Sequence, residues 1–107
     1  MAQFDVHCNK GALRDSIPFV VVVQSAQFDR YRRRVVVSLV RQTVLPADTP
    51  TVGARMNLVF IIDGVRVILH SLDIVSVALD QLGVVVGSLE QEGQIIADAL
   101  DELFNRS

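Results

Sequence analysis

Tryptophan is absent from this chain of 107 residues, cysteine occurs once and proline only three times. The single Cys8 excludes an internal disulfide and is typical of a protein in a reducing compartment. So few prolines, in a chain that is half hydrophobic, exclude a disordered protein. We therefore expect one globular domain over residues 1–107.

Long hydrophobic runs are also lacking. The longest are IPFVVVV (17–23) and LVFII (58–62), and both fall far short of the roughly 20 apolar residues that span a bilayer. The first residues, MAQFDVHCNKG, have no basic stretch leading into an apolar core, so we expect no signal peptide. These absences together predict a cytoplasmic protein.

Motifs for catalysis and metal binding are missing as well. The chain has no phosphate-binding Walker loop and no GxGxxG, and its two histidines and one cysteine lack ligand spacing. His7 and Cys8 are neighbours on a strand and should point to opposite faces. We expect no cofactor, no metal and no catalytic residue.

Arg66 and His70 are the one pair that leaves an alternative open. They share a face of the segment VRVILH and lie about 13 Å apart at about 3.3 Å per residue. A site that cleaves phosphodiesters could use the arginine for charge and the histidine as general acid or base. The competing interpretation is an ordinary solvent-facing side of a hairpin.

Charge is distributed unevenly, although the net charge is only −2. Residues 1–41 hold seven bases and three acids, whereas residues 67–104 hold seven acids and no Lys or Arg. The bases include the cluster RYRRR (30–34), which has three interpretations: a solvated turn, an anchor for an acidic protein partner, or a contact to a phosphate backbone. Because the chain is acidic overall, we expect no direct nucleic-acid readout.

Most of the chain has the pattern of β-strands. Residues 4–8 alternate apolar and polar side chains, as in a half-buried edge strand. Residues 18–25 are a continuous β-branched run, typical of a strand covered on both faces. Residues 33–40 repeat that composition, so these two segments should form an antiparallel hairpin around the polar AQFDRYR.

Asp63-Gly64 predicts a second hairpin with a type I′ turn, between strands at residues 57–62 and 65–70. Residues 41–56 contain two prolines and are expected to form a loop or a small excursion with a short strand of its own. Residues 73–88 are expected to form one further strand with a bend near Gly83.

The last segment changes from a strand pattern to a helix pattern. Apolar pairs recur every four residues along one stripe: Ile95/Ile96, Ala99/Leu100 and Leu103/Phe104. Ser88 is the expected N-cap, with Gln91 at the capping-box position, although Gly93 argues for a later start of the regular helix. The predicted fold is an antiparallel sheet or partly open barrel of five to seven strands, closed by a C-terminal helix.

Five short segments, QFDV (3–6), VQS (23–25), RRVVVSL (33–39), LGVVVGSL (82–89) and the terminal LF (103–104), follow one another in a distinctive order. In that order and at nearly constant offsets, the chain resembles the CcdB family, the toxins of plasmid- and chromosome-borne toxin–antitoxin modules. The similarity covers nearly the whole chain, and no single segment is specific by itself.

The resemblance implies an SH3-like barrel with a C-terminal helix and a symmetric homodimer. It implies a toxin that is not an enzyme, but wedges into the A subunit of DNA gyrase and traps the cleavage complex. It also implies a cognate antitoxin whose disordered segment folds onto the toxin. The family's helix ends in Phe-Trp-Gly-Ile, so the implied target-binding residues here are those of the last positions: Phe104, Asn105, Arg106 and Ser107.

The chain departs from the family pattern at this tip, where only Phe104 matches. Ser38 and Ala78 stand where proline is usual, and Ala26-Gln27-Phe28 alters the apolar pair expected after VQS. Three hypotheses follow: a topoisomerase-binding toxin with an altered tip, a non-toxic module on the same scaffold that binds an antitoxin or related partner, and an endoribonuclease like the MazF/Kid-type toxins that share the barrel.

Overall fold

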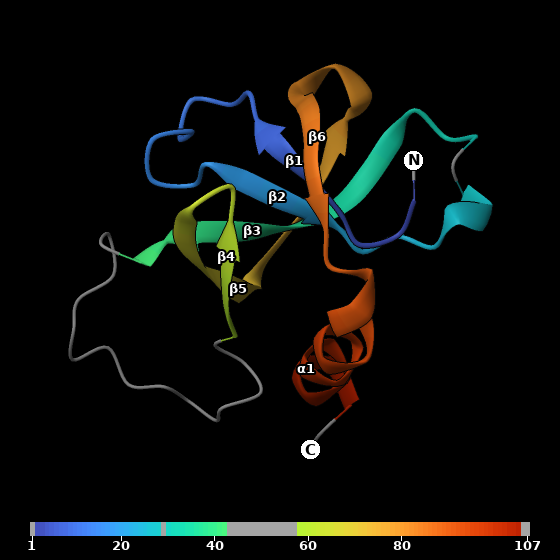
Figure 1. Ribbon diagram of the computed structural model, residues 1–107. Helices are drawn as coiled ribbons and strands as arrows, with labels where there is room; N and C mark the ends of the chain where they lie inside the picture. Colours follow the sequence, from blue (N-terminus) through green and yellow to red (C-terminus); the bar gives the residue numbers. More distant parts are fainter. Residues whose placement is uncertain (1, 29, 43–57, 106–107) are drawn as a thin grey trace.

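The structure is a computed structural model that describes residues 2–28, 30–42 and 58–105. Within these ranges the chain forms one α-helix, α1 (Gly93–Asn105), and six strands: β1 (Asp5–Asn9), β2 (Phe19–Val22), β3 (Arg33–Arg41), β4 (Val59–Ile62), β5 (Val65–Ala78) and β6 (Leu82–Ser88). The strands pair antiparallel in the order β4-β5-β3-β2-β1-β6 and curve into a nearly closed barrel, with α1 beyond the end of β6 (Figure 1). The predicted barrel with a C-terminal helix is confirmed.

Both predicted hairpins are present. β2 pairs with β3 from Phe19↔Leu39 to Val22↔Val36, and all four β2 residues are buried, as their β-branched run predicts. β4 and β5 meet at Asp63 and Gly64, whose φ angles of 51° and 79° are the two positive values that a type I′ turn requires. The predicted loop at residues 41–56 lies almost entirely outside the described residues.

The prediction that the first strand is an edge strand is wrong. β1 pairs with β2 on one side and with β6 on the other, so the edges of the described sheet are β4 and β6. The polar positions in β1 suggested a solvent-facing side. However, His7 is buried, because the second face of the sheet is covered as well.

The predicted single strand at residues 73–88 is also wrong. Residues 73–78 continue β5, a 3₁₀ turn at Leu79–Gln81 makes the bend, and Gly83 lies inside β6. β5 also carries a bulge, since the pairing changes from Ser38↔His70 to Val37↔Ile74 and leaves residues 71–73 unpaired with β3. No glycine or proline marks this bulge, so the sequence pattern gave no sign of it.

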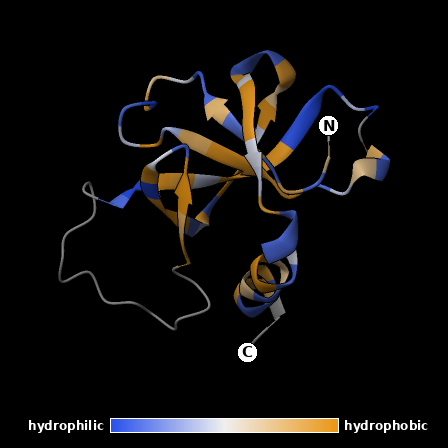
Figure 2. Cartoon of the chain, viewed as in Figure 1, coloured by the Kyte–Doolittle hydropathy of each residue, from blue (hydrophilic) through white to orange (hydrophobic). Residues whose placement is uncertain are grey.

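Each face of the sheet is buried in a hydrophobic cluster of its own. The larger one joins the sheet to α1, since Val21, Val37 and Leu69 pack in the same cluster as Ile96. The smaller one lies on the opposite face and is formed by Val20, Val22, Val36 and Leu82. Apolar residues accordingly fill the central strands, while α1 shows apolar and polar residues together (Figure 2).

The helix begins later than Ser88, as Gly93 suggested. The Ser88 hydroxyl accepts a hydrogen bond from the backbone N–H of Glu90 at 3.1 Å, a 3₁₀ turn follows at Glu90–Glu92, and α1 starts at Gly93. Gly93 is buried against the ring of Phe4. The start of α1 is therefore fixed by contact with the N-terminal segment.

Substitution of the two glycines of β6 should have opposite outcomes. A Cβ at Gly83 would lie 2.9 Å from the Cβ of Cys8 and 3.0 Å from its carbonyl oxygen, whereas a Cβ at Gly87 would meet no heavy atom within 4 Å. We expect Gly83→Ala to lower the free energy of unfolding by about 1–3 kcal/mol, because backbone of β1 would have to move. Gly87→Ala should change it by less than about 0.5 kcal/mol. Urea unfolding of both variants tests this, and equal midpoints would contradict it.

Candidate functional site

The helix α1 presents one face to the barrel and leaves the other exposed. Ile96 and Ala99 are fully buried, and Leu100 and Leu103 are half-buried, so four of the six residues of the predicted apolar stripe face the barrel. The other two residues of the stripe are exposed, Ile95 at 49% and Phe104 at 70%. The buried face fixes the position of the helix, and hence of its last turn.

Of the predicted tip residues, the structure places the side chain of Phe104 alone. It stands in the last turn of α1 and is 70% exposed. Asn105 is the final helical residue, and Arg106 and Ser107 lie outside the described residues. An exposed aromatic ring at the end of a packed helix is a suitable anchor for a protein partner, because its burial removes a large apolar surface from water.

Arg66 and His70 share a face of the sheet, as predicted. Arg66 is exposed opposite Ile61, whereas His70 is half-buried opposite Ser38. The Ser38 hydroxyl does not bond to His70, but donates a hydrogen bond of 2.6 Å to the Asp73 carboxylate. Neither Arg66 nor His70 lines either of the two pockets described below.

His7 and Cys8 form no nucleophile–base pair. His7 is buried on the face of the smaller cluster, and its Nδ1 lies 3.0 Å from the carbonyl oxygen of Gly83. Cys8 packs against the larger cluster on the other face. The predicted opposite orientation is confirmed, and the described residues contain no group of three or more potential metal ligands.

The arginine cluster at residues 30–34 is only partly the solvated turn that the sequence suggested. Arg30, Arg32 and Arg33 are exposed, but Arg34 is only 4% exposed and donates hydrogen bonds to the carbonyl oxygens of Tyr31 and Arg33. Since β3 begins at Arg33, alternation along the strand turns Arg34 toward the covered face. The prediction is wrong for this residue.

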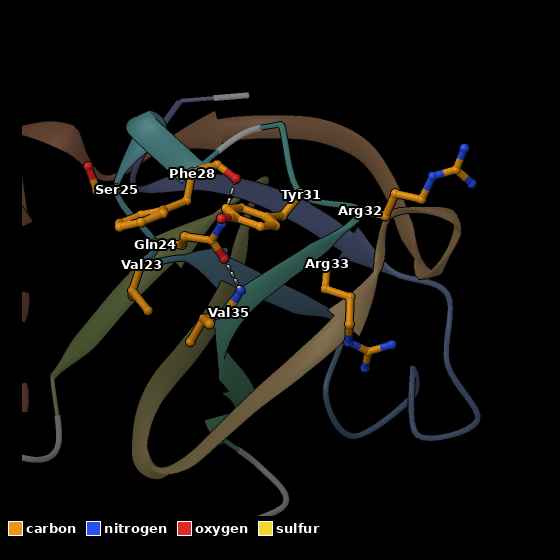
Figure 3. A pocket seen from close by; sticks show the side chains of 8 residues that line it. All are labelled: Val23, Gln24, Ser25, Phe28, Tyr31, Arg32, Arg33 and Val35. Atoms are coloured by element: carbon orange, nitrogen blue, oxygen red, sulfur yellow. Dashed lines mark hydrogen bonds between the residues drawn. The ribbon is translucent and has the colours of Figure 1, made fainter.

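A pocket that the sequence did not reveal lies beside this cluster. We call it the aromatic pocket; it has a volume of about 670 Å³ and is lined by Val23, Gln24, Ser25, Phe28, Tyr31, Arg32, Arg33 and Val35 (Figure 3). The signal that could have found it is the presence of two aromatic residues, Phe28 and Tyr31, in an otherwise polar turn. A second pocket of about 400 Å³ lies where the N-terminal segment meets α1, between Phe4 and Ala97.

A model of the family described as "CcdB protein" matches residues 3–105, which is nearly the whole chain. The chain belongs to the CcdB family. No curated relative matches it at a significant level. CcdB proteins are toxins of toxin–antitoxin modules and act on gyrase as poisons, not as enzymes. Membership therefore disfavours the endoribonuclease hypothesis.

Within the ranges that the structure describes, no helix is both long enough and apolar enough to cross a membrane. This observation agrees with the short apolar runs of the sequence.

Proposed function

We propose that this chain is the toxin of a type II toxin–antitoxin module, that it binds the A subunit of DNA gyrase as a cytoplasmic homodimer, and that it traps the cleavage complex. The whole chain serves as one domain in this proposal. The observation that carries it is the exposed Phe104 at the end of α1, in a chain whose family match spans residues 3–105.

The packing of α1 explains how a short tip can act. Ile96 and Ala99 hold the helix on the barrel, so the ring of Phe104 needs little ordering when it binds. In a symmetric dimer the same tip occurs twice, and a two-fold axis near α1 would place both copies against one target. Asn105, Arg106 and Ser107 complete the proposed contact surface and contribute polar groups where the family has an apolar tip.

Trapping is a matter of relative affinity. A poison that makes and breaks no covalent bond holds DNA cleaved only if it binds the cleaved state of gyrase more tightly than the resealed state. A hundredfold preference corresponds to about 2.7 kcal/mol and is within reach of one buried aromatic anchor on each protomer. No catalytic residue is required.

One observation favours a second candidate, a non-toxic module that binds the antitoxin or a related partner. The chain has no tryptophan, and three polar residues follow Phe104. Loss of a buried aromatic anchor commonly costs about 2 kcal/mol or more of binding free energy. A tip without tryptophan would then bind gyrase too weakly to trap it, while the rest of the scaffold still binds the antitoxin or related partner.

A gyrase supercoiling and DNA-cleavage assay separates the two candidates. The purified protein is compared with the triple variant Asn105→Trp, Arg106→Gly, Ser107→Ile. We expect the natural protein to raise the amount of cleaved DNA, and the triple variant to do so at a lower concentration because it regains the anchor. Trapping by the triple variant alone would support the non-toxic module. Trapping by neither would reject gyrase as the target.

A further inference from the structure

The aromatic pocket lies at the start of β3, and no residue of the helix tip lines it. Its floor is aliphatic: Val35 is 36% exposed, and Val23 packs against the larger core cluster. Its walls are the rings of Phe28 and Tyr31, which are 44% and 53% exposed. Their centroids are 6.3 Å apart and the planes are inclined by 36°, so the two rings pack against each other and together form one side of the apolar hollow (Figure 3).

Hydrogen bonds hold this hollow open. The side chain of Gln24 donates to the carbonyl oxygen of Phe28 at 3.2 Å, and its own carbonyl oxygen accepts from the backbone N–H of Val35 at 2.9 Å. One glutamine thus ties the turn that carries Phe28 to the strand that forms the floor. Because the walls are set before binding, an occupant does not have to order them.

The rim of the pocket is positively charged. Arg32 and Arg33 line it, and the guanidinium of Arg30 lies 5.5 Å from the ring centroid of Tyr31. Arg33 is held by Ser76, since its Nε donates to the Ser76 hydroxyl at 2.9 Å. Among the lining residues that the structure describes, none is an aspartate or a glutamate. Cations around an apolar floor complement carboxylates that flank an apolar anchor.

A protein segment fits these features better than a nucleic acid does. Bases could stack on Phe28 and Tyr31 and the arginines of the rim could contact phosphates, but the aliphatic floor suits an apolar side chain. The chain is also acidic overall, and the seven acids of residues 67–104 would repel a long polyanion. A short segment meets mainly the local field of the arginines, because salt screens charges beyond about 10 Å.

We infer that the aromatic pocket is a docking site for an acidic segment of a partner protein, in which Asp or Glu residues flank a leucine or an aromatic anchor. The anchor packs against the rings of Phe28 and Tyr31 and the valines of the floor, and the flanking carboxylates pair with Arg30, Arg32 and Arg33. This inference does not depend on gyrase being the target of the helix tip.

A displayed library of random dodecapeptides tests the inference directly. The immobilised protein selects peptides, and fluorescence anisotropy then measures the affinity of the enriched ones for four variants. Phe28→Ala removes a wall and Arg32→Glu reverses the charge of the rim. Leu13→Ala truncates an exposed apolar side chain outside the pocket, and Arg14→Glu reverses an exposed charge there, so these two variants are the controls. Thermal unfolding confirms that every variant is folded.

We expect the enriched peptides to combine acidic residues with one apolar anchor. Phe28→Ala should weaken their binding at least about tenfold, and the two control variants should change it by less than about twofold. Arg32→Glu should weaken it severalfold in low salt, with a smaller effect in high salt.

Three results would overturn the inference. They are a selection without enrichment, enriched peptides without acidic residues, and binding that Phe28→Ala and Leu13→Ala affect equally. Displacement of an enriched peptide by single-stranded RNA at a lower concentration than by free peptide would assign the pocket to nucleic acid instead. Gyrase is absent from this experiment. If the peptide selection fails, the proposal that the chain binds gyrase is therefore neither supported nor contradicted, and the cleavage assay still tests it.

Discussion

Ile96→Ala is expected to lower the free energy of unfolding by about 2–5 kcal/mol. Ile96 has no exposed surface and lies in the core cluster that joins α1 to the strands. The smaller side chain would leave a cavity under the helix, and the close packing of the larger cluster gives the site little room to collapse. Chemical denaturation followed by circular dichroism measures the change.

The neighbouring residue provides a matched control. Ile95→Ala removes the same atoms from the same helix, but Ile95 is 49% exposed and loses far fewer contacts. We expect its effect to stay within about 1 kcal/mol. If both substitutions cost the same, α1 does not pack on the barrel through Ile96, and the account of how the tip is positioned would have to be abandoned.

Phe104→Ala is expected to raise the concentration needed for half-maximal trapping of cleaved DNA by at least about tenfold, in line with the loss of an aromatic hot spot. Its free energy of unfolding should change by less than about 0.5 kcal/mol, because the side chain is 70% exposed. The cleavage assay and a denaturation curve on the same preparation separate the two effects.

Ile95→Ala serves as the control here too, since it also truncates an exposed apolar side chain of α1. We expect it to trap DNA as well as the natural protein. Equal potency of Phe104→Ala and the natural protein would remove Phe104 from the binding surface, even if the natural protein is a gyrase poison.

The sequence predicted those elements that a local signal defines. Two β-branched runs gave β2 and β3, the Asp63-Gly64 dipeptide gave the β4–β5 turn, and the four-residue repeat gave α1. It failed where tertiary contacts decide. The alternating pattern of residues 4–8 does not reveal that β6 pairs with the outer edge of β1. Likewise, no local signal shows that residues 73–78 continue β5 and do not start a new strand.

The candidate sites were predicted unevenly, for a similar reason. Family resemblance pointed to Phe104, and the helical stripe implied that a residue at its end is poorly covered. The aromatic pocket, in contrast, depends on the hydrogen bond between Gln24 and Val35, which are 11 residues apart in sequence. The burial of Arg34 depends on the residue at which β3 begins. Neither property exists before the chain has folded.

The bulge in β5 sets the phase of that strand. Before it, the even-numbered residues Ile68 and His70 share a face with Ser38 and Val40, whereas after it the odd-numbered Val75 and Val77 occupy the face of Val36 and Arg34. The two halves of one continuous strand therefore follow opposite alternation. A length change of one residue at the bulge would turn the second half over, exchanging Ile74 with its neighbours. Insertions and deletions at this point are compatible with the barrel only in pairs of residues.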